Sequence, residues 1–89
     1  MRELLKKAIQ TINEELEVDA FKEIGDDTRI FEYLDSIAIL DLILEIEDLL
    51  QEQYGRYIQI ADDKSMDSTH TSFKTFATLL KDIEGKVNG

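Results

Sequence analysis

Residues 33–48 read YLDSIAILDLILEIED, and this stretch decides the fold that the rest of the sequence predicts. Asp35 and Ser36 are both good N-cap residues, and apolar side chains recur after them at helical spacing. We therefore expect a helix that begins at Asp35 or Ser36 and runs to about Gln53, because Gly55 follows and favours a helix end. Its core-facing stripe is predicted to consist of Leu42, Ile43, Ile46, Leu49 and Leu50.

An amphipathic helix is also predicted near each end of the chain. The first runs from about Arg2 to Glu17, and Thr71 or Ser72 is expected to cap the last. A short additional turn of helix is compatible with residues 62–67. The apolar positions are Leu4, Leu5, Ala8, Ile9, Ile12 and Leu16 in the first helix, and Phe73, Phe76, Ala77, Leu79, Leu80 and Ile83 in the last.

A long connection joins the first two predicted helices, with its turn residues at 25–28 (Gly-Asp-Asp-Thr). Residues 56–60 alternate like a strand, but no partner strand is present in the sequence, so we expect an extended loop there. The predicted fold is all-α, a three- to four-helix bundle with a long first loop and a single domain over residues 1–89. The loop side chains expected to pin it to the core are Phe21, Ile24, Ile30, Phe31 and Leu34.

The charge balance narrows the classes of partner. The 89-residue chain carries 20 acidic and 10 basic residues, a net charge of −10. Nucleic acids and anionic membrane surfaces are therefore excluded as partners, and positively charged proteins are favoured. The apolar run 37–44 is too short to insert across a membrane, and no secretion signal is visible, so we expect a cytoplasmic protein and, most simply, a monomer.

The sequence offers little material for catalysis or metal binding. It has no cysteine, and His70 is its only histidine, with no motif that links it to a nucleophilic serine. We therefore predict no catalytic residue and no enzymatic activity. The acidic loop with Asp62, Asp63 and Asp67 lacks the spacing and the glycine of an EF-hand, so no metal site is predicted there. A small enzyme that uses these three acids with calcium or magnesium stays as an alternative.

Ser36 is the residue to which the sequence points for function. A serine at a helix start is exposed, and a phosphodiester on its oxygen would lie where free amides and the helix dipole favour an anion. Beyond it, Ile37, Leu40 and Leu44 follow the spacing of an outward apolar strip, which is an arrangement typical of transient partner sites when charges surround it. The flanking acids are Asp41, Glu47 and Asp48.

Taken together, these features resemble the acyl carrier protein family over nearly the whole chain. Asp35-Ser36-Ile37 matches the family's Asp-Ser-(Leu/Ile) motif, and residues 30–34 (Ile-Phe-Glu-Tyr-Leu) match its aromatic–hydrophobic signature upstream. The chain length, the serine after a long loop and the acidic helix behind it are also similar. In this family the serine carries a 4'-phosphopantetheine arm.

The resemblance implies that a phosphopantetheinyl transferase moves the arm from coenzyme A onto Ser36, beside Asp35. The thiol of the arm would hold an acyl or aminoacyl group as a thioester. Further partners would be an acyl- or aminoacyl-loading ligase and downstream acyl-transfer enzymes with basic docking surfaces. By position in the motif, the partner-facing residues would be Ile37, Leu40, Asp41, Leu44, Glu47 and Asp48.

Two departures from the family pattern concern the cargo. Tyr33 stands where many members have the glycine of Gly-x-Asp-Ser-Leu, and residues 54–71 form a long segment. The Leu-Asp-Ser form of residues 34–36 is more similar to stand-alone carriers of the D-alanyl and specialised-pathway kinds. Both departures argue against the role of a fatty-acid carrier. The interior either opens to shelter an acyl chain or forms a closed core, which is favoured for so small a domain; the residues concerned are Leu42, Ile46, Leu50, Phe73, Phe76 and Leu80. An acidic helical interaction module without a prosthetic group is the alternative function.

Overall fold

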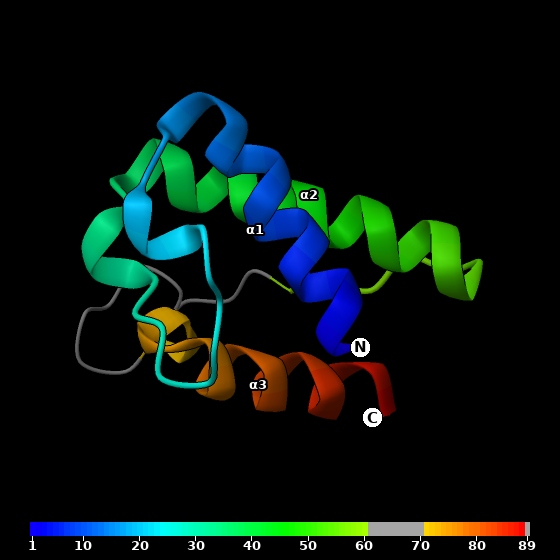
Figure 1. The fold of residues 1–89 in the computed structure, drawn as a ribbon. Helices are drawn as coiled ribbons and strands as arrows, with labels where there is room; N and C mark the ends of the chain where they lie inside the picture. The colour runs from blue at the N-terminus through cyan, green and yellow to red at the C-terminus, as the bar shows by residue number, and fades with distance from the viewer. Residues whose placement is uncertain (61–70, 89) are drawn as a thin grey trace.

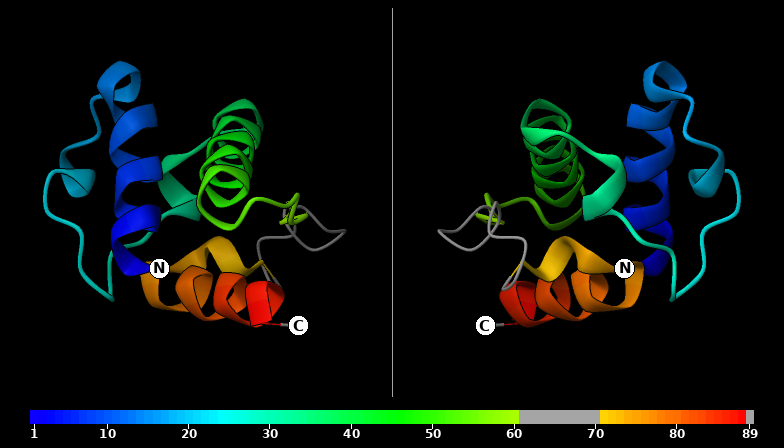
Figure 2. Two further views of the ribbon diagram at one scale, coloured as in Figure 1. Left: turned by 90° about the vertical axis from the view of Figure 1, so that its right-hand side faces the viewer. Right: turned by 90° about the vertical axis from the view of Figure 1, so that its left-hand side faces the viewer.

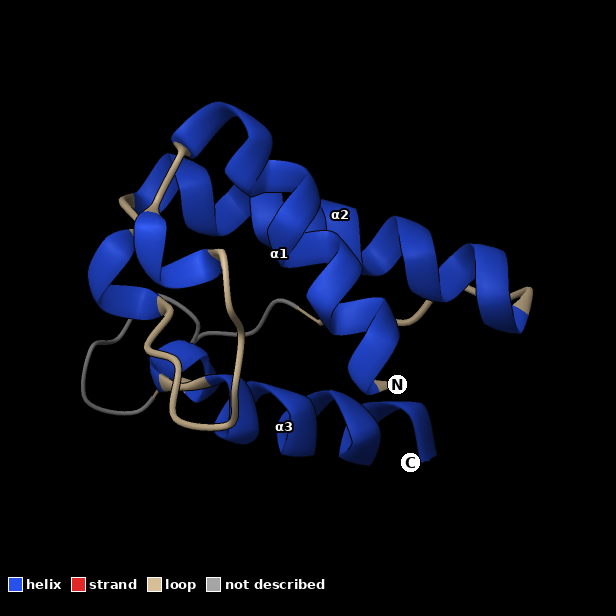
Figure 3. Cartoon of the chain, in the orientation of Figure 1, coloured by secondary structure: helices blue, strands red, loops and turns tan. Residues whose placement is uncertain are grey.

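The computed structural model describes residues 1–60 and 71–88, and within them it is a bundle of three α-helices without strands. Figures 1 and 2 show α1 and α2 side by side, with α3 lying below both. Short 3₁₀ turns and loops make the connections (Figure 3). The predicted small helical bundle with a long first loop is therefore confirmed. The elements are α1 (Arg2–Leu16), η1 (Asp19–Phe21), η2 (Phe31–Tyr33), α2 (Ser36–Tyr54), η3 (Ser72–Lys74) and α3 (Phe76–Asn88).

Both ends of α2 are fixed by the residues that the sequence indicated. The Asp35 carboxylate accepts a hydrogen bond from the Ala38 N–H at 2.8 Å and caps the helix. At the other end Gly55 adopts φ 70° and donates its N–H to the Gln51 carbonyl at 2.9 Å. Glycine reaches this left-handed conformation without the steric cost that a Cβ imposes. The predicted start and end of this helix are confirmed to within one residue.

The core collects side chains from all three helices and from the long first loop. Leu42, Ile43, Ile46 and Leu50 of the predicted α2 stripe are buried, while Leu49 is only partly buried. The loop contributes buried Phe21, Ile30 and Leu34, and the segment before residue 61 contributes Ile58 and Ile60. Ile24 and Phe31 pack against the core from its edge. The loop is thus held by its own apolar side chains, as its sequence predicted.

The start of α3 differs from the prediction. Thr71 caps only the short turn η3, through a hydrogen bond from the Phe73 N–H to its Oγ1 at 3.1 Å. The helix begins at Phe76, behind Thr75. Thr75 Oγ1 accepts from the Thr78 N–H at 3.2 Å, and Thr78 Oγ1 accepts from the Thr75 N–H at 3.1 Å. This reciprocal pair is a capping box with threonine in place of glutamate.

Pairing of the first loop with the chain before α3 explains the late start. The Ile30 N–H donates to the Lys74 carbonyl at 3.1 Å, and the Phe76 N–H donates to the Thr28 carbonyl at 2.9 Å. These bonds flank Thr75, which is extended at φ −131° and ψ 165° and therefore interrupts the helix. The Ala77 side chain, predicted to be buried, is exposed instead. Its N–H donates to the Asp26 carbonyl at 3.1 Å, so it lies at the loop-covered start of the helix.

Of the other two segments considered from the sequence, one lies within the described residues and one does not. Residues 56–60 form a loop and not a strand, as expected. The turn of helix expected at 62–67 lies outside the described residues. None of the described helices combines the length and the apolar character needed to cross a bilayer.

Candidate functional site

Ser36 is the first residue of α2 and is exposed. Its hydroxyl forms no hydrogen bond with the described residues. The hydroxyl is therefore open to reaction without any change in the packed core. Asp35, the preceding residue, is also exposed, and its carboxylate is engaged by the N–H at the third position of the helix.

The backbone around Ser36 suits an attached anion. The first amides of an α-helix have no intrahelical acceptor, and at this helix start the Asp35 side chain takes up only that of Ala38. The N–H groups of Ser36 and Ile37 are left at the positive end of the helix dipole. A phosphodiester on the Ser36 oxygen would fit this position, which agrees with the chemistry expected from the sequence.

An apolar strip on the outer face of α2 lies directly behind Ser36. It consists of Ile37, Leu40 and Leu44, whose side chains are 70%, 51% and 59% exposed. Spacing of three and four residues places them on one face of the helix, and the same helix buries Leu42 and Ile46 on its inner face. The predicted division of α2 into an outward strip and a core stripe is confirmed.

The acidic rim of this strip is smaller than predicted. Asp41 and Asp48 are exposed, but Glu47 is buried, with 7% of its surface accessible. Its placement on the outer rim was wrong because it follows Ile43 by four residues and precedes Leu50 by three, and so shares their buried face. This spacing was the signal in the sequence that could have revealed its position.

Glu47 has a structural role on that inner face. Its carboxylate accepts the Ile60 N–H at 2.9 Å and the Tyr57 hydroxyl at 3.3 Å. The Ile60 carbonyl in turn accepts from Lys86 Nζ at 2.6 Å, and Lys86 forms an ion pair with Asp82 at 3.0 Å. Residues 57–60 are therefore fastened to α2 on one side and to α3 on the other.

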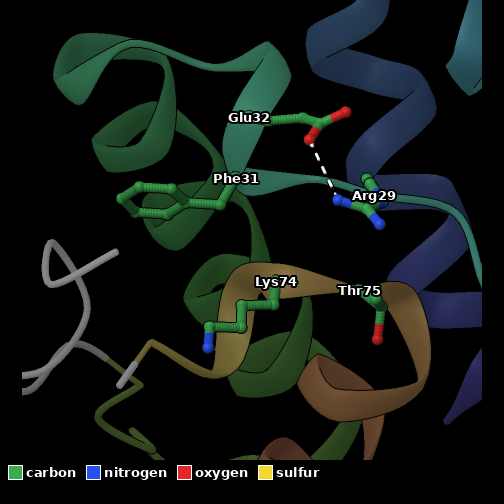
Figure 4. A pocket seen from close by; sticks show the side chains of 5 residues that line it. All are labelled: Arg29, Phe31, Glu32, Lys74 and Thr75. Carbon is green, nitrogen blue, oxygen red and sulfur yellow. Dashed lines mark hydrogen bonds and ion pairs between the residues drawn. The ribbon is translucent and has the colours of Figure 1, made fainter. Parts of the chain in front are cut away.

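A surface hollow lies between η2 and η3, and we call it the η2–η3 hollow. It has a volume of about 430 Å³, which is within the size range of small-ligand sites. Figure 4 shows the Phe31 and Lys74 side chains extending in the same direction, with the ion pair between Arg29 and Glu32 on the other side. Its lining residues are Arg29, Phe31, Glu32, Lys74 and Thr75. No sequence pattern predicts this hollow, because its two halves are more than forty residues apart along the chain.

The six side chains considered for an acyl-chain pocket all belong to the core. Leu42, Ile46, Leu50, Phe73, Phe76 and Leu80 are all buried. None of them lines the η2–η3 hollow or either of two further surface hollows, which lie beside α1 and α2 and along α3.

The other sequence-based candidates give no site in the described part of the chain. Residues 1–60 and 71–88 contain no group of three or more His, Asp or Glu residues placed to hold a metal ion. His70 and the three acids Asp62, Asp63 and Asp67 lie outside the described residues.

Comparison with protein-family models, with curated proteins and with solved structures found no match to this chain. A functional assignment therefore depends on the geometry of the site and on the sequence motif around Ser36.

Proposed function

We propose that this chain is a carrier protein, in which Ser36 bears a 4'-phosphopantetheine arm and the arm holds an acyl or aminoacyl group as a thioester. The observation that carries the proposal is the exposed hydroxyl of Ser36 at the first position of a helix whose outer face is apolar and acid-rimmed. The thiol of the arm supplies the one nucleophile that this cysteine-free chain lacks.

Attachment needs only an accessible hydroxyl. The Ser36 oxygen forms a bond to the phosphorus of coenzyme A that bears the pantetheine, and the pyrophosphate bond breaks. Adenosine bisphosphate leaves, and the hydroxyl proton passes to a base of the transferase. The role of the chain is to hold the oxygen at a helix start, where the N–H groups of Ser36 and Ile37 can donate to the new phosphodiester.

The partners are enzymes that visit the α2 face: a phosphopantetheinyl transferase, a loading ligase and acyl-transfer enzymes. The apolar strip supplies the contact area, and Asp41 and Asp48 favour basic surfaces beside it. The net charge of −10 accelerates such encounters at low ionic strength. Docking is therefore expected to weaken as salt is added.

An acidic interaction module without a prosthetic group is the second candidate. The apolar strip favours it, because three large exposed side chains on one helix face can serve a partner whether or not Ser36 is modified. The two candidates differ in what the Ser36 hydroxyl does. In the carrier it is esterified; in the module it only begins a helix.

Intact-mass measurement separates the two candidates. The purified chain is incubated with coenzyme A and a broad-specificity phosphopantetheinyl transferase whose activity is verified on a separate carrier. We expect a mass gain of one phosphopantetheine, its loss in Ser36→Ala, and its retention in Ser72→Ala. Ser72 is a matched control because its hydroxyl already donates to Asp82 at 3.1 Å, away from α2. An unchanged mass of the wild-type chain would reject the carrier function.

A further inference from the structure

Backbone hydrogen bonds hold the two halves of the η2–η3 hollow together. Hydrogen bonds from the Ile30 N–H to the Lys74 carbonyl, at 3.1 Å, and from the Phe76 N–H to the Thr28 carbonyl, at 2.9 Å, join its two halves. Thr75 is held between them by the capping box of α3. The positions of Arg29 and Lys74 are therefore set by backbone pairing, which is a more rigid support than an unpaired loop.

The charge of this hollow is opposite to that of the whole chain. Arg29 and Lys74 outnumber the one acid, Glu32, in the lining. The Arg29–Glu32 pair, at 3.3 Å, is exposed and so contributes little stability. Lys74 forms no ion pair with the described residues. The ammonium of Lys74 and part of the Arg29 guanidinium are thus available to an anion.

The other two hollows lack this combination. The hollow beside α1 and α2 is lined by Lys7 but also by Glu3 and Glu52, so acids predominate. In the hollow along α3, Lys86 already bonds to the Ile60 carbonyl and to Asp82, and the remaining cation, Lys81, has no large apolar side chain beside it. Neither contains an aromatic side chain. The η2–η3 hollow is therefore the one of the three in which cations outnumber acids and an aromatic side chain, that of Phe31, lies beside them.

Ser36 lies close enough along the chain for a group attached to it to reach this hollow. Ser36 is the fifth residue after Phe31, so their Cα atoms are at most roughly 18 Å apart even for a fully extended chain. Because η2 and a helix cap lie in between, the actual separation is shorter. An extended phosphopantetheine arm reaches on the order of 15 Å by the same measure of chain advance. The end of the arm, and the cargo on it, can therefore reach the hollow.

We propose that the η2–η3 hollow binds the distal carboxylate of a dicarboxylic acyl group carried on Ser36, with Arg29 and Lys74 contacting the carboxylate and Phe31 contacting the methylenes. This inference rests on the proposed carrier function and gives the class of cargo. An acyl group with a terminal carboxylate is attracted by both cations, whereas an aminoacyl cargo with a free ammonium is repelled by them. The hollow therefore favours dicarboxylic cargo over the D-alanyl cargo suggested by the sequence.

Three loaded forms of the protein test this inference. A transferase attaches coenzyme A analogues with amide-linked succinyl, butyryl or 4-aminobutyryl groups, which share a four-carbon chain and differ in terminal charge. Backbone amide shifts are then measured at Arg29, Phe31 and Lys74. We expect the succinyl form to shift these amides most, with a bound population roughly two- to fivefold above that of the butyryl form, as suits exposed ion pairs. The 4-aminobutyryl form is expected to shift them least.

Charge-matched variants supply the control. Arg29→Gln with Lys74→Gln is expected to abolish the difference between the succinyl and butyryl forms, and raised salt is expected to reduce it. Lys7→Gln with Lys81→Gln removes the same charge from exposed residues in the other two hollows and is expected to preserve the difference. Thermal melts establish that both double variants are folded.

Failure of the carrier function and failure of the proposed cargo site give different results. If the mass shows that no analogue attaches to Ser36, the carrier function and this inference both fail. If all three analogues attach and the three amides respond equally to each, only the assignment of the hollow fails. A difference that persists in Arg29→Gln with Lys74→Gln also overturns it.

Discussion

The buried carboxylate of Glu47 accepts the backbone N–H of Ile60 at 2.9 Å, across a separation of 13 residues in sequence. This bond satisfies a buried donor at the end of a loop that has no strand partner in the described residues. The same carboxylate accepts the Tyr57 hydroxyl at 3.3 Å. One acid on the inner face of α2 thus supplies the hydrogen-bond acceptor that a neighbouring strand would have offered to the Ile60 N–H.

Replacement of Glu47 is expected to lower the free energy of unfolding most when no hydrogen-bond acceptor remains for the Ile60 N–H. Glu47→Ala leaves the Ile60 N–H without a partner and should lower the free energy of unfolding by about 1–3 kcal/mol. Glu47→Gln keeps a carbonyl acceptor of similar shape and should cost less. Urea unfolding measures both. The neighbouring exposed Asp48 is the control, since Asp48→Ala should change stability by no more than about 0.5 kcal/mol. Equal effects of Glu47→Ala and Asp48→Ala would contradict the structural role of this bond.

The phenol of Tyr57 is expected to lose its proton at a higher pH than an ordinary tyrosine. Desolvation and the nearby Glu47 carboxylate raise the pKa of Tyr57 above its ordinary value of 10.0. Because the folded state favours the protonated phenol, its contribution to stability is complete below about pH 10 and is lost as pH rises through the higher folded pKa. Absorbance titration of the wild type minus that of Tyr57→Phe should show the missing phenol ionising above pH 10. Glu47→Gln should move this component downward, and an unmoved titration would rule out the acid as a cause.

Two glycines of similar surroundings are expected to respond to alanine with opposite signs. A Cβ at Gly55 or at Gly85 would meet no atom within 4 Å, so packing does not distinguish them. Gly55 has φ 70°, where alanine is strained, and Gly55→Ala should destabilise the chain by about 1 kcal/mol. Gly85 lies within α3, where Gly85→Ala should stabilise it by about 0.5–1 kcal/mol. Thermal unfolding distinguishes the two, and a Gly55→Ala variant as stable as the wild type would show that the end of α2 does not depend on a left-handed glycine.

The sequence was sufficient for α2 because both of its ends are local. Asp35 caps it within three residues, and Gly55 ends it within four. The start of α3 was missed because several Ser and Thr residues precede it. The choice of Thr75 over Thr71 depends on hydrogen bonds to Thr28 and Ile30, far back in the chain. Local patterns cannot rank caps that a distant loop decides.

The candidate site also contains some residues that the sequence could place and others that it could not. Ser36 and the apolar strip behind it follow from one helix, so motif and spacing were enough to place them. The prediction for Glu47 was wrong because acids are usually exposed, whereas its spacing from Ile43 and Leu50 places it among core residues. The η2–η3 hollow needs Arg29 and Lys74 together, and no local pattern joins them. Residues brought together by tertiary pairing become visible only in three dimensions.

Substitution of leucines on opposite faces of α2 distinguishes effects on partner docking from effects on folding. Leu44 is 59% exposed in the apolar strip, and Leu42 is fully buried two residues earlier. Leu44→Ala should leave the free energy of unfolding within about 0.5 kcal/mol of the wild type. If Leu44 is one of the main contacts of the strip, the same change should lower kcat/KM for modification of Ser36 by about fivefold or more.

Leu42→Ala is the matched change on the inner face. It should lower the free energy of unfolding by about 2–5 kcal/mol through loss of buried contacts and the cavity left behind. At a temperature where this variant is still folded, its kcat/KM in the transferase reaction should stay near the wild-type value, since the outer face is unchanged. If Leu44→Ala is modified as fast as the wild type while Leu40→Ala is too, the transferase does not use the strip. Ser36 would then be recognised from its own loop, and the acidic face of α2 would have to serve a different partner.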